Sequence, residues 1–328
     1  MQIDVHWHHI PPAYIDRLRA GNDPSGDFLE IGADGVDYLV TRRLRIPLPA
    51  QLWSAPETIA ELDRRELDMA LVSPSPTLYQ YQLSEAEAEA LAVVTNHGIR
   101  DLVESHPDRF VGLGTVPLQH PKRATEWLTK CMEELGLKGA MIGTHVQGLN
   151  LDDPGFADFF AAADRLGAYL FIHPLAVLGP ERLSRYYLTN LIGNPTETTV
   201  AFASLVFGGI LDRHPNIRFC FAHGGGMIPY QVGRLDRGYR VRPECEGRCL
   251  EAPSAYLRRV YFDSLTHGVE QFEALVRIAG ADRVMLGSDY PFDMGSETAA
   301  EEVGGAPIPE SERRAILGET ASRLFGLR

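Results

Sequence analysis

The sequence has little of what membrane proteins and nucleic-acid-binding proteins need. Among its 328 residues, 31 Lys and Arg stand against 44 Asp and Glu, which gives a formal net charge of −13. This balance repels phosphate backbones and anionic lipid, so we expect no nucleic-acid partner and no binding to a membrane surface. The chain also lacks an uninterrupted apolar run of about 18 residues, which a bilayer-spanning helix needs.

Leader and cysteine signals are equally sparse. The N-terminal residues MQIDVHWHH lack the basic start and apolar run of a signal peptide, so a cytoplasmic location is expected. The four cysteines are then expected to be reduced thiols. Cys245 and Cys249 come closest to a metal spacing, but a zinc site needs two more ligands and the sequence offers no second pair.

What the sequence does contain is an alternation of short apolar runs with longer amphipathic segments. The expected strands are Ile3–His8, Met69–Pro74, Phe110–Pro117, Gly139–His145, Ala168–His173, Ile217–His223, Val260–Ser264 and Val284–Asp289. Strands and helices in strict alternation predict a parallel sheet covered by helices, and about eight such units predict an α/β fold of the (β/α)8 TIM-barrel type. Neither a flexible linker nor an internal repeat interrupts it, so residues 1–328 are expected to form a single barrel domain.

One stretch does not fit the repeat. Residues 19–51 are rich in Gly, Asp and Arg, contain short alternating runs such as Val36–Leu39, and follow the first strand. We interpret them as a small inserted β-rich lid. Loops after barrel strands lie over the active site, so the insert is expected to cover the site.

Polar residues that end the apolar strands carry the functional argument. The first strand ends in His6-Trp7-His8, and residues i and i+2 of a strand point to the same side. Other strands end at His173, His223 and Asp289. A barrel delivers all of these groups to one rim, because its strands are parallel.

Each of these residues alone has an ordinary structural interpretation, as a hydrogen-bonded strand end or a turn former. Their coincidence at the same end of four strands favours a metal site. Imidazole nitrogens with one carboxylate suit Zn²⁺ and related divalent ions, and an open coordination position makes such a site catalytic.

Four motifs resemble a known family. They are Asp4-Val5-His6-Trp7-His8, His173-Pro174, the F-x-H-G-G-G at Phe221–Gly226 and the G-S-D-Y-P-F at Gly287–Phe292. Their order and spacing are similar to those of the amidohydrolase superfamily, and within it to the decarboxylase subgroup that includes α-amino-β-carboxymuconate-ε-semialdehyde decarboxylase.

The resemblance implies a mononuclear site with His6, His8, His173 and Asp289 as metal ligands. It implies that His223 is the acid/base residue that activates a metal-bound water, with Asp289 beside it as a catalytic group. One divalent ion is expected, Zn²⁺ in the first place with Mn²⁺ as the alternative.

The metal count also has support in the sequence. Binuclear members of the superfamily carry a bridging lysine at the end of the fourth strand, whereas Lys138 precedes that strand here.

Further residues are expected to hold the substrate. By position, Arg45 in the insert and Arg234 match arginines that hold the carboxylate in the family. The family supplies the second of them across a dimer interface, so a homodimer is implied. His145 after the fourth strand and His267 after the seventh are additional candidates for the pocket wall.

The predicted function is a metal-dependent, non-oxidative decarboxylase whose partner is a small aromatic or unsaturated carboxylate. A hydrolase or hydratase that uses the same site on a lactone, an amide or a double bond is the alternative, because the fold does not decide between them. The complete ligand set argues against a barrel that has lost catalysis and only binds.

Overall fold

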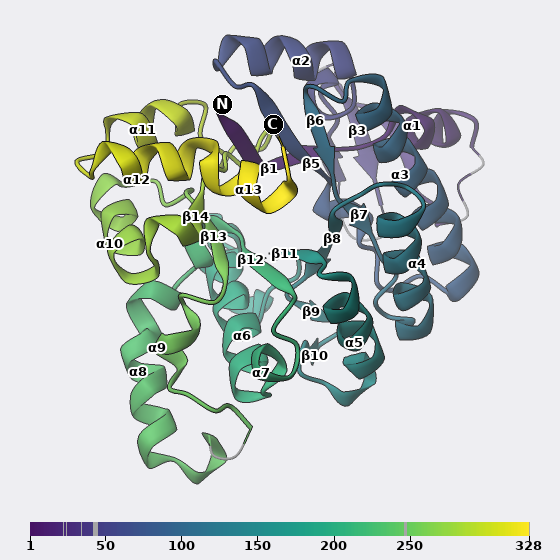
Figure 1. Cartoon of the computed structure of the whole chain (residues 1–328). Helices are drawn as coiled ribbons and strands as arrows, with labels where there is room; N and C mark the ends of the chain where they lie inside the picture. Colours follow the sequence, from purple (N-terminus) through teal and green to yellow (C-terminus); the bar gives the residue numbers. More distant parts are fainter. Residues whose placement is uncertain (22, 24, 34, 42–44, 246–247, 328) are drawn as a thin grey trace.

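Short parallel strands form the centre of the molecule (Figure 1). The computed structural model describes residues 1–21, 23, 25–33, 35–41, 45–245 and 248–327. The central strands are β1 (Ile3–His9), β5 (Met69–Pro74), β6 (Phe110–Gly112), β7 (Gly114–Thr115), β8 (Gly139–Gly143), β11 (Tyr169–His173), β12 (Arg218–Phe221), β13 (Tyr261–Asp263) and β14 (Val284–Met285). Only Leu113 separates β6 from β7, and its N–H still donates to the carbonyl of Val72 in β5, so the two act as one strand.

The strands close into a ring. Neighbours in chain order pair in parallel, from β1 with β5 through to β13 with β14. The ring closes between β1 and the segment around β14, where the Val5 N–H donates to the Leu286 carbonyl and the His8 N–H donates to the Tyr290 carbonyl, both at 2.8 Å. The predicted (β/α)8 barrel is therefore confirmed.

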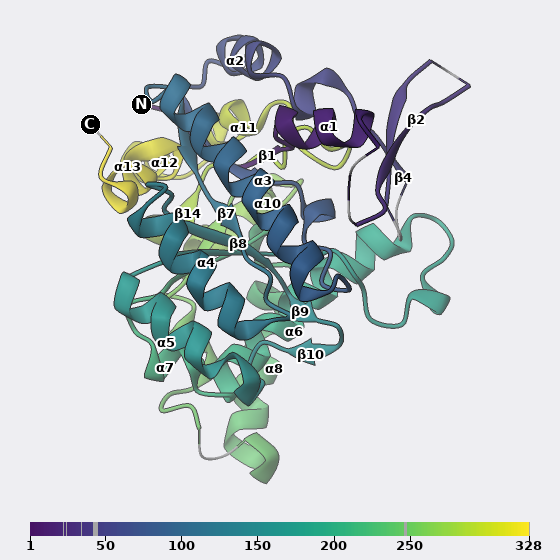
Figure 2. The ribbon, with the colours of Figure 1, turned by 90° about the vertical axis from the view of Figure 1, so that its right-hand side faces the viewer.

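Helices cover the outside of the ring (Figures 1 and 2). They are α2 (Ala55–Arg64), α3 (Glu85–Ser105), α4 (Pro121–Glu133), α5 (Ala157–Leu166), α6 (Asn194–Phe207), α7 (Ile210–Arg213), α8 (Ile228–Val241), α9 (Pro253–Tyr256), α10 (Val269–Ala279), α11 (Ala299–Gly305), α12 (Glu310–Arg314) and α13 (Thr320–Phe325). Local capping starts two of them, since Ser54 accepts from the first turn of α2 and Ser84 forms a capping box with Glu87 in α3.

The insert after β1 begins earlier than the sequence predicts. A short helix, α1 (Pro12–Arg19), precedes an antiparallel sheet of β2 (Phe28–Ile31), β3 (Asp37–Val40) and β4 (Arg45–Pro47). This sheet projects from one side of the barrel beside α1 (Figure 2). Leu39 of β3 joins Tyr14 of α1 and Leu91 of α3 in a small separate core, which fixes the insert to the barrel. The insert is β-rich as expected, and its action as a lid stays a prediction.

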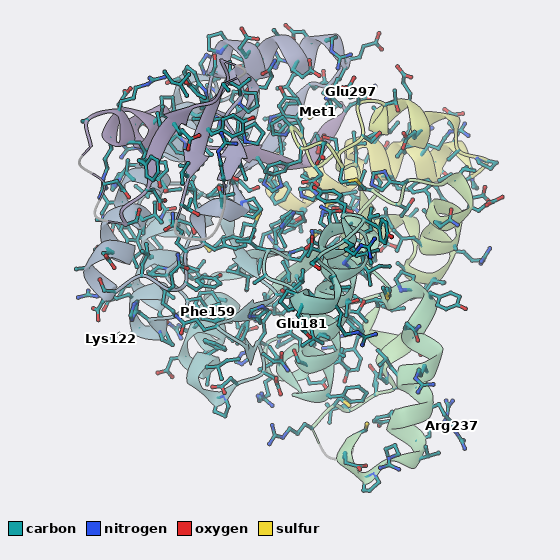
Figure 3. The ribbon with its side chains drawn as sticks, turned by 180° about the vertical axis from the view of Figure 1, so that it is seen from behind. Met1, Lys122, Phe159, Glu181, Arg237 and Glu297 are labelled. Atoms are coloured by element: carbon teal, nitrogen blue, oxygen red, sulfur yellow. The ribbon has the colours of Figure 1, made fainter. Side chains whose placement is uncertain are left out.

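Buried residues lie on the barrel strands and on the helix faces that pack against them. Phe159 of α5 is fully buried, whereas Lys122, Glu181 and Arg237, which Figure 3 also labels, are exposed. A further antiparallel pair, β9 (His145–Val146) with β10 (Leu149–Asn150), follows β8 at the rim. Among the described residues, no helix combines the length and the apolar character that crossing a membrane requires.

Candidate metal centre and active site

Three strands bring four potential metal ligands to one rim of the barrel. His6 and His8 project from β1, His173 ends β11, and Asp289 follows β14. Each is buried, and one ligand atom from each lies within 4.8 Å of the others. We call this group the four-ligand cluster. It is the single candidate metal group among the described residues, so the structure indicates one divalent-metal site.

The distances within the four-ligand cluster converge on one carboxylate oxygen. Oδ1 of Asp289 lies 3.1 Å from Nε2 of His6, 2.9 Å from Nε2 of His8 and 3.8 Å from Nε2 of His173. The two Nε2 atoms of His6 and His8 are themselves 3.1 Å apart. Two imidazole nitrogens so close to each other and to a carboxylate are suited to share a cation.

The histidine tautomers fit a metal ion as well. Nδ1 of His173 donates to the carbonyl of Pro174 at 2.8 Å, which leaves Nε2 with a lone pair. This buried Nε2 has no hydrogen-bond partner among the described residues. In His6, Nδ1 donates to Asp263 at 2.6 Å, so Nε2 is the nitrogen that faces the cluster. A divalent cation would satisfy both nitrogens.

The three histidines of the cluster differ in their pKa values. Burial lowers the pKa of His8 to about 4 and that of His173 to about 3, which keeps both imidazoles neutral and able to coordinate. Burial also lowers the pKa of His6, but Asp289 and Asp263 outweigh it and raise the value to about 10. Burial opposes ionisation of Asp289, yet the His6 charge and the imidazole hydrogen bonds hold its pKa well below the usual range.

His223 lies next to the four-ligand cluster without belonging to it. It follows β12, and its Nε2 is 3.5 Å from Oδ2 of Asp289, the carboxylate oxygen that faces away from the shortest imidazole contacts. Its backbone has φ 57°, a left-handed conformation, at the start of a short turn that continues through Gly224 and Gly225. This turn presents the imidazole at the edge of the cluster.

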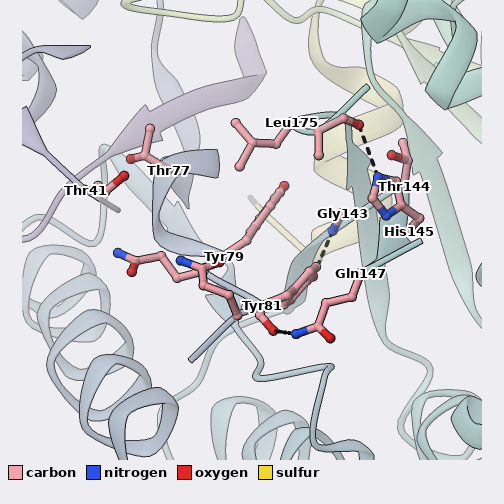
Figure 4. Close-up of a pocket in the computed structure, with 12 residues that line it drawn as sticks. Thr41, Thr77, Tyr79, Tyr81, Gly143, Thr144, His145, Gln147 and Leu175 are labelled. Carbon is pink, nitrogen blue, oxygen red and sulfur yellow. Dashed lines mark hydrogen bonds between the residues drawn. The ribbon is translucent and has the colours of Figure 1, made fainter. Parts of the chain in front are cut away.

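A pocket lies near the end of β11, where Gly143 in its wall pairs with His173, and its described wall contains none of the four-ligand cluster itself (Figure 4). Thr77, Tyr79 and Leu175 point into the same space, and Leu175 lies two residues after His173. Burial raises the pKa of the Tyr79 hydroxyl well above its usual value, and the charges of Tyr81 and Asp289 add to the effect. Asp289 is thus close enough to act electrostatically on the pocket wall.

Of the two additional histidines, His145 lines this pocket and His267 does not. Both nitrogens of His145 are engaged by the backbone: Nδ1 accepts from the N–H of Gly148 at 3.0 Å and Nε2 donates to the carbonyl of Ala176 at 3.2 Å. His267 lines another cavity, of about 250 Å³, together with Phe272 and Glu302. The described wall of that cavity contains none of the four-ligand cluster.

The two arginines lie outside the described pocket wall. Arg45 is on the exposed side of the insert sheet, where it pairs with Glu30 at 2.9 Å and stacks over the ring of Tyr38 at 3.5 Å. Arg234 is exposed on α8. Their roles in substrate binding stay predictions, as do those of His145 and His267.

Sequence reasoning missed one residue at the centre of the site. Asp263 ends β13 and is fully buried, and its carboxylate contacts both His6 and the turn of His223. The signal was available, because Asp263 is the first ionisable group after an apolar strand, as Asp289 is. Lys138, in contrast, precedes β8 as expected and lies at the opposite end of that strand from the rim.

Comparison with known proteins agrees with this geometry. A 2-amino-3-carboxymuconate-6-semialdehyde decarboxylase from Dictyostelium discoideum is 36% identical over 332 residues, which cover 100% of this chain and 92% of the relative. The crystal structure of a 5-carboxyvanillate decarboxylase from Sphingomonas paucimobilis superposes with a TM-score of 0.85 at 26% identity, over 100% of this chain and 99% of the other.

A second solved structure has the same fold. A 5-carboxyvanillate decarboxylase from Novosphingobium aromaticivorans, with bound manganese and 3-methoxy-4-hydroxy-5-nitrobenzoic acid, has a TM-score of 0.84 and 24% identity. The superposition covers 100% of this chain and 97% of the other chain. The sequence profile of the Amidohydrolase family matches residues 3–327. With the barrel, the four-ligand cluster and this match together, the chain belongs to the amidohydrolase family.

Proposed function

We propose that this protein is a metal-dependent, non-oxidative decarboxylase of an unsaturated or aromatic carboxylic acid. The observation that carries the proposal is the buried four-ligand cluster at the rim of the barrel, with His223 3.5 Å from Asp289. The similar proteins described above support it, since each is named as a decarboxylase. The proposed partner is accordingly a small carboxylate.

A divalent ion bound by the four-ligand cluster supplies Lewis acidity that polarises an oxygen of the substrate. Three imidazoles and one carboxylate are a donor set that Zn²⁺ accepts readily, and Mn²⁺ is the ion in one of the similar structures. We therefore propose one divalent ion, Zn²⁺ in the first place and Mn²⁺ as the alternative.

The chain's own task is proton transfer. The carbon that bears the carboxylate takes up one proton, and the electron pair of the broken bond then restores the conjugated double bond as CO2 leaves, so no oxidant or reductant is needed. We assign this proton to Nε2 of His223, because it lies at the edge of the cluster, 3.5 Å from Oδ2 of Asp289. An unsaturated substrate is required, since protonation of the carbon before the carboxylate leaves needs a conjugated oxygen to supply electrons.

The residues of the pocket wall suit the ring or the conjugated chain of the substrate better than its carboxylate. The described lining residues include hydroxyls from Thr77 and Tyr79 and an amide from Gln80, but no Lys, Arg, Asp or Glu. A neutral polar wall suits a hydroxylated ring or a conjugated chain. The charge that balances the substrate carboxylate then comes from the bound ion and from arginines such as Arg234.

We further propose a homodimer in which α8 lies against a second copy. Arg234, Arg237 and Arg240 are exposed on this helix although the chain as a whole has a net charge of −13. A local cationic surface on an acidic protein favours an acidic partner surface, and a second copy supplies one.

Decarboxylation is tested with the metal-loaded protein and a panel of ortho-hydroxy aromatic acids, muconate semialdehydes and lactones. In D2O, a substrate labelled with ¹³C at the carboxyl group should release labelled CO2 and gain one deuterium at the vacated carbon. Addition of water without CO2 release would overturn the proposal in favour of a hydratase or hydrolase. A protein that binds no divalent ion after repeated loading would contradict both readings.

A further inference from the structure

Asp263 occupies a position between the metal site and the acid/base residue. It ends β13, is fully buried, and accepts four N–H groups with its two oxygens. Oδ2 accepts from Nδ1 of His6 at 2.6 Å and from the backbone N–H of His223 at 2.8 Å. Oδ1 accepts from the backbone N–H groups of Gly224 at 2.7 Å and Leu265 at 3.2 Å.

The contact with His6 determines which nitrogen faces the four-ligand cluster. A carboxylate only accepts hydrogen bonds, so Nδ1 of His6 must carry the proton. Nε2 is then the nitrogen left to bind a metal ion, and it lies 3.1 Å from Oδ1 of Asp289. A carboxylate behind a ligating imidazole fixes its orientation and increases its basicity.

The contacts with His223 and Gly224 hold an unusual backbone. Both residues are left-handed, with φ 57° at His223 and 60° at Gly224, a region that residues with a side chain rarely adopt. The same carboxylate accepts both successive N–H groups. It therefore holds the turn that directs the His223 imidazole toward Asp289.

We propose that Asp263 is a positioning residue that sets the metal-binding tautomer of His6 and the placement of His223 with one carboxylate. This proposal rests on the proposed function for the role of His223, whereas its His6 part concerns metal binding alone. Asp263 touches neither substrate nor metal. Its effect on turnover passes through two other side chains.

Asp263→Asn separates this role from simple packing. The variant keeps the shape but has one acceptor oxygen instead of two. If the amide nitrogen replaces Oδ2, it opposes Nδ1–H of His6 and the N–H of His223; if it replaces Oδ1, it opposes the N–H groups of Gly224 and Leu265. The first orientation disturbs both functions, and the second disturbs only the turn that carries His223.

The matched control is Asp212→Asn. Asp212 is also a largely buried carboxylate that accepts several bonds, from the Leu250 N–H at 2.9 Å and from Arg259 at 2.8 Å, and its partners lie outside the metal site. Both variants remove one carboxylate from a hydrogen-bonded cluster. Only Asp263→Asn is expected to change the metal site.

The experiment measures Zn²⁺ and Mn²⁺ affinity by competition with a chelator, the visible spectrum of the Co²⁺-loaded protein, the thermal midpoint, and kcat and KM. Asp263→Asn should bind metal about 10–100-fold more weakly or show an altered Co²⁺ spectrum. At saturating metal its kcat should fall at least tenfold with little change in KM. Asp212→Asn should lower only the thermal midpoint. Wild-type metal affinity, Co²⁺ spectrum and kcat in Asp263→Asn would overturn the proposal.

Two features keep the test decisive. If Asp263→Asn does not fold, ¹⁵N-histidine NMR of the unmodified Zn²⁺-loaded protein still reports the tautomer, and a proton on Nε2 of His6 would contradict the proposal. The metal readouts need no substrate. A protein that decarboxylates nothing but whose metal affinity depends on Asp263 would refute the proposed function and leave the His6 part standing.

Discussion

His223 and the metal ligands lie within one small volume but have different consequences when removed. His223→Ala should keep the bound metal, because its Nε2 is not part of the four-ligand cluster and lies 3.5 Å from Oδ2 of Asp289. Turnover should fall by about 10²–10⁴-fold, the usual contribution of a general acid or base. Elemental analysis of the purified variant, together with kcat, measures both quantities.

The matched control for His223→Ala is His173→Ala. Nε2 of His173 faces the four-ligand cluster, so its loss should remove metal and activity together. A His223→Ala protein that purifies without metal would make His223 a ligand and remove it from the proton-transfer role.

The position of a side chain could be predicted from the sequence where the two-residue period of a strand alone decides to which side it points. His6 and His8 are two apart on a strand, and the ends of parallel strands meet at one rim, so the gathering of these groups could be predicted from the sequence. The choice of four ligands without His223 came from the family resemblance. Arg45 could not be placed in this way. Its direction depends on how the insert sheet packs, and in the structure its guanidinium lies over Tyr38 and pairs with Glu30.

At the scale of elements, the close pairing of β8 with β11 depends on one glycine. Gly139 has φ 147°, and a Cβ on it would lie 1.9 Å from the carbonyl oxygen of Tyr169, its partner in β11. Gly139→Ala should therefore push the two strands apart and destabilise the fold by about 3 kcal/mol, at the upper end of ordinary single substitutions. The midpoint of thermal unfolding, followed by circular dichroism, gives the shift.

Gly304→Ala on α11 is the control for Gly139→Ala. A Cβ at Gly304 meets nothing within 4 Å, and alanine favours a helix over glycine by about 1 kcal/mol, so this variant should unfold at an equal or slightly higher temperature. A Gly139→Ala protein as stable as the control would show that β8 and β11 can separate at no cost.

The elements that sequence patterns missed are those whose apolar face forms only in tertiary context. α1 has eight residues, and its buried Tyr14, Ile15 and Leu18 become a core only against α3 and the insert sheet. In α8 only Ile228 is fully buried, and arginines occupy the exposed side of the helix. The barrel strands were predictable because both of their faces are buried, so each is a continuous apolar run.

At the scale of the whole molecule, the negative net charge conflicts with the binding of an anionic substrate at the site. A chain of net charge −13 repels the anionic substrate proposed for it, so cationic groups must be concentrated at the barrel mouth. The described wall of the pocket has neither Lys nor Arg, and the four-ligand cluster provides a place for only one ion. An arginine that arrives from a second copy would resolve this conflict, and Arg234 on the exposed side of α8 is the candidate. The single-domain organisation and the cytoplasmic location also stay predictions at this scale.

Subunit mixing tests whether Arg234 acts on the site of a second copy. Arg234→Ala and His223→Ala should each be nearly inactive alone, the first through loss of substrate binding and the second through loss of proton transfer. In a hybrid dimer, the copy that keeps His223 meets the intact Arg234 of the other, so one complete site is restored. Free exchange between equal amounts should recover about a quarter of the wild-type activity, since half of the dimers are hybrids with one site each. Full activity of Arg234→Ala alone, or no recovery on mixing although light scattering shows hybrid dimers of two tagged variants, would exclude a shared site.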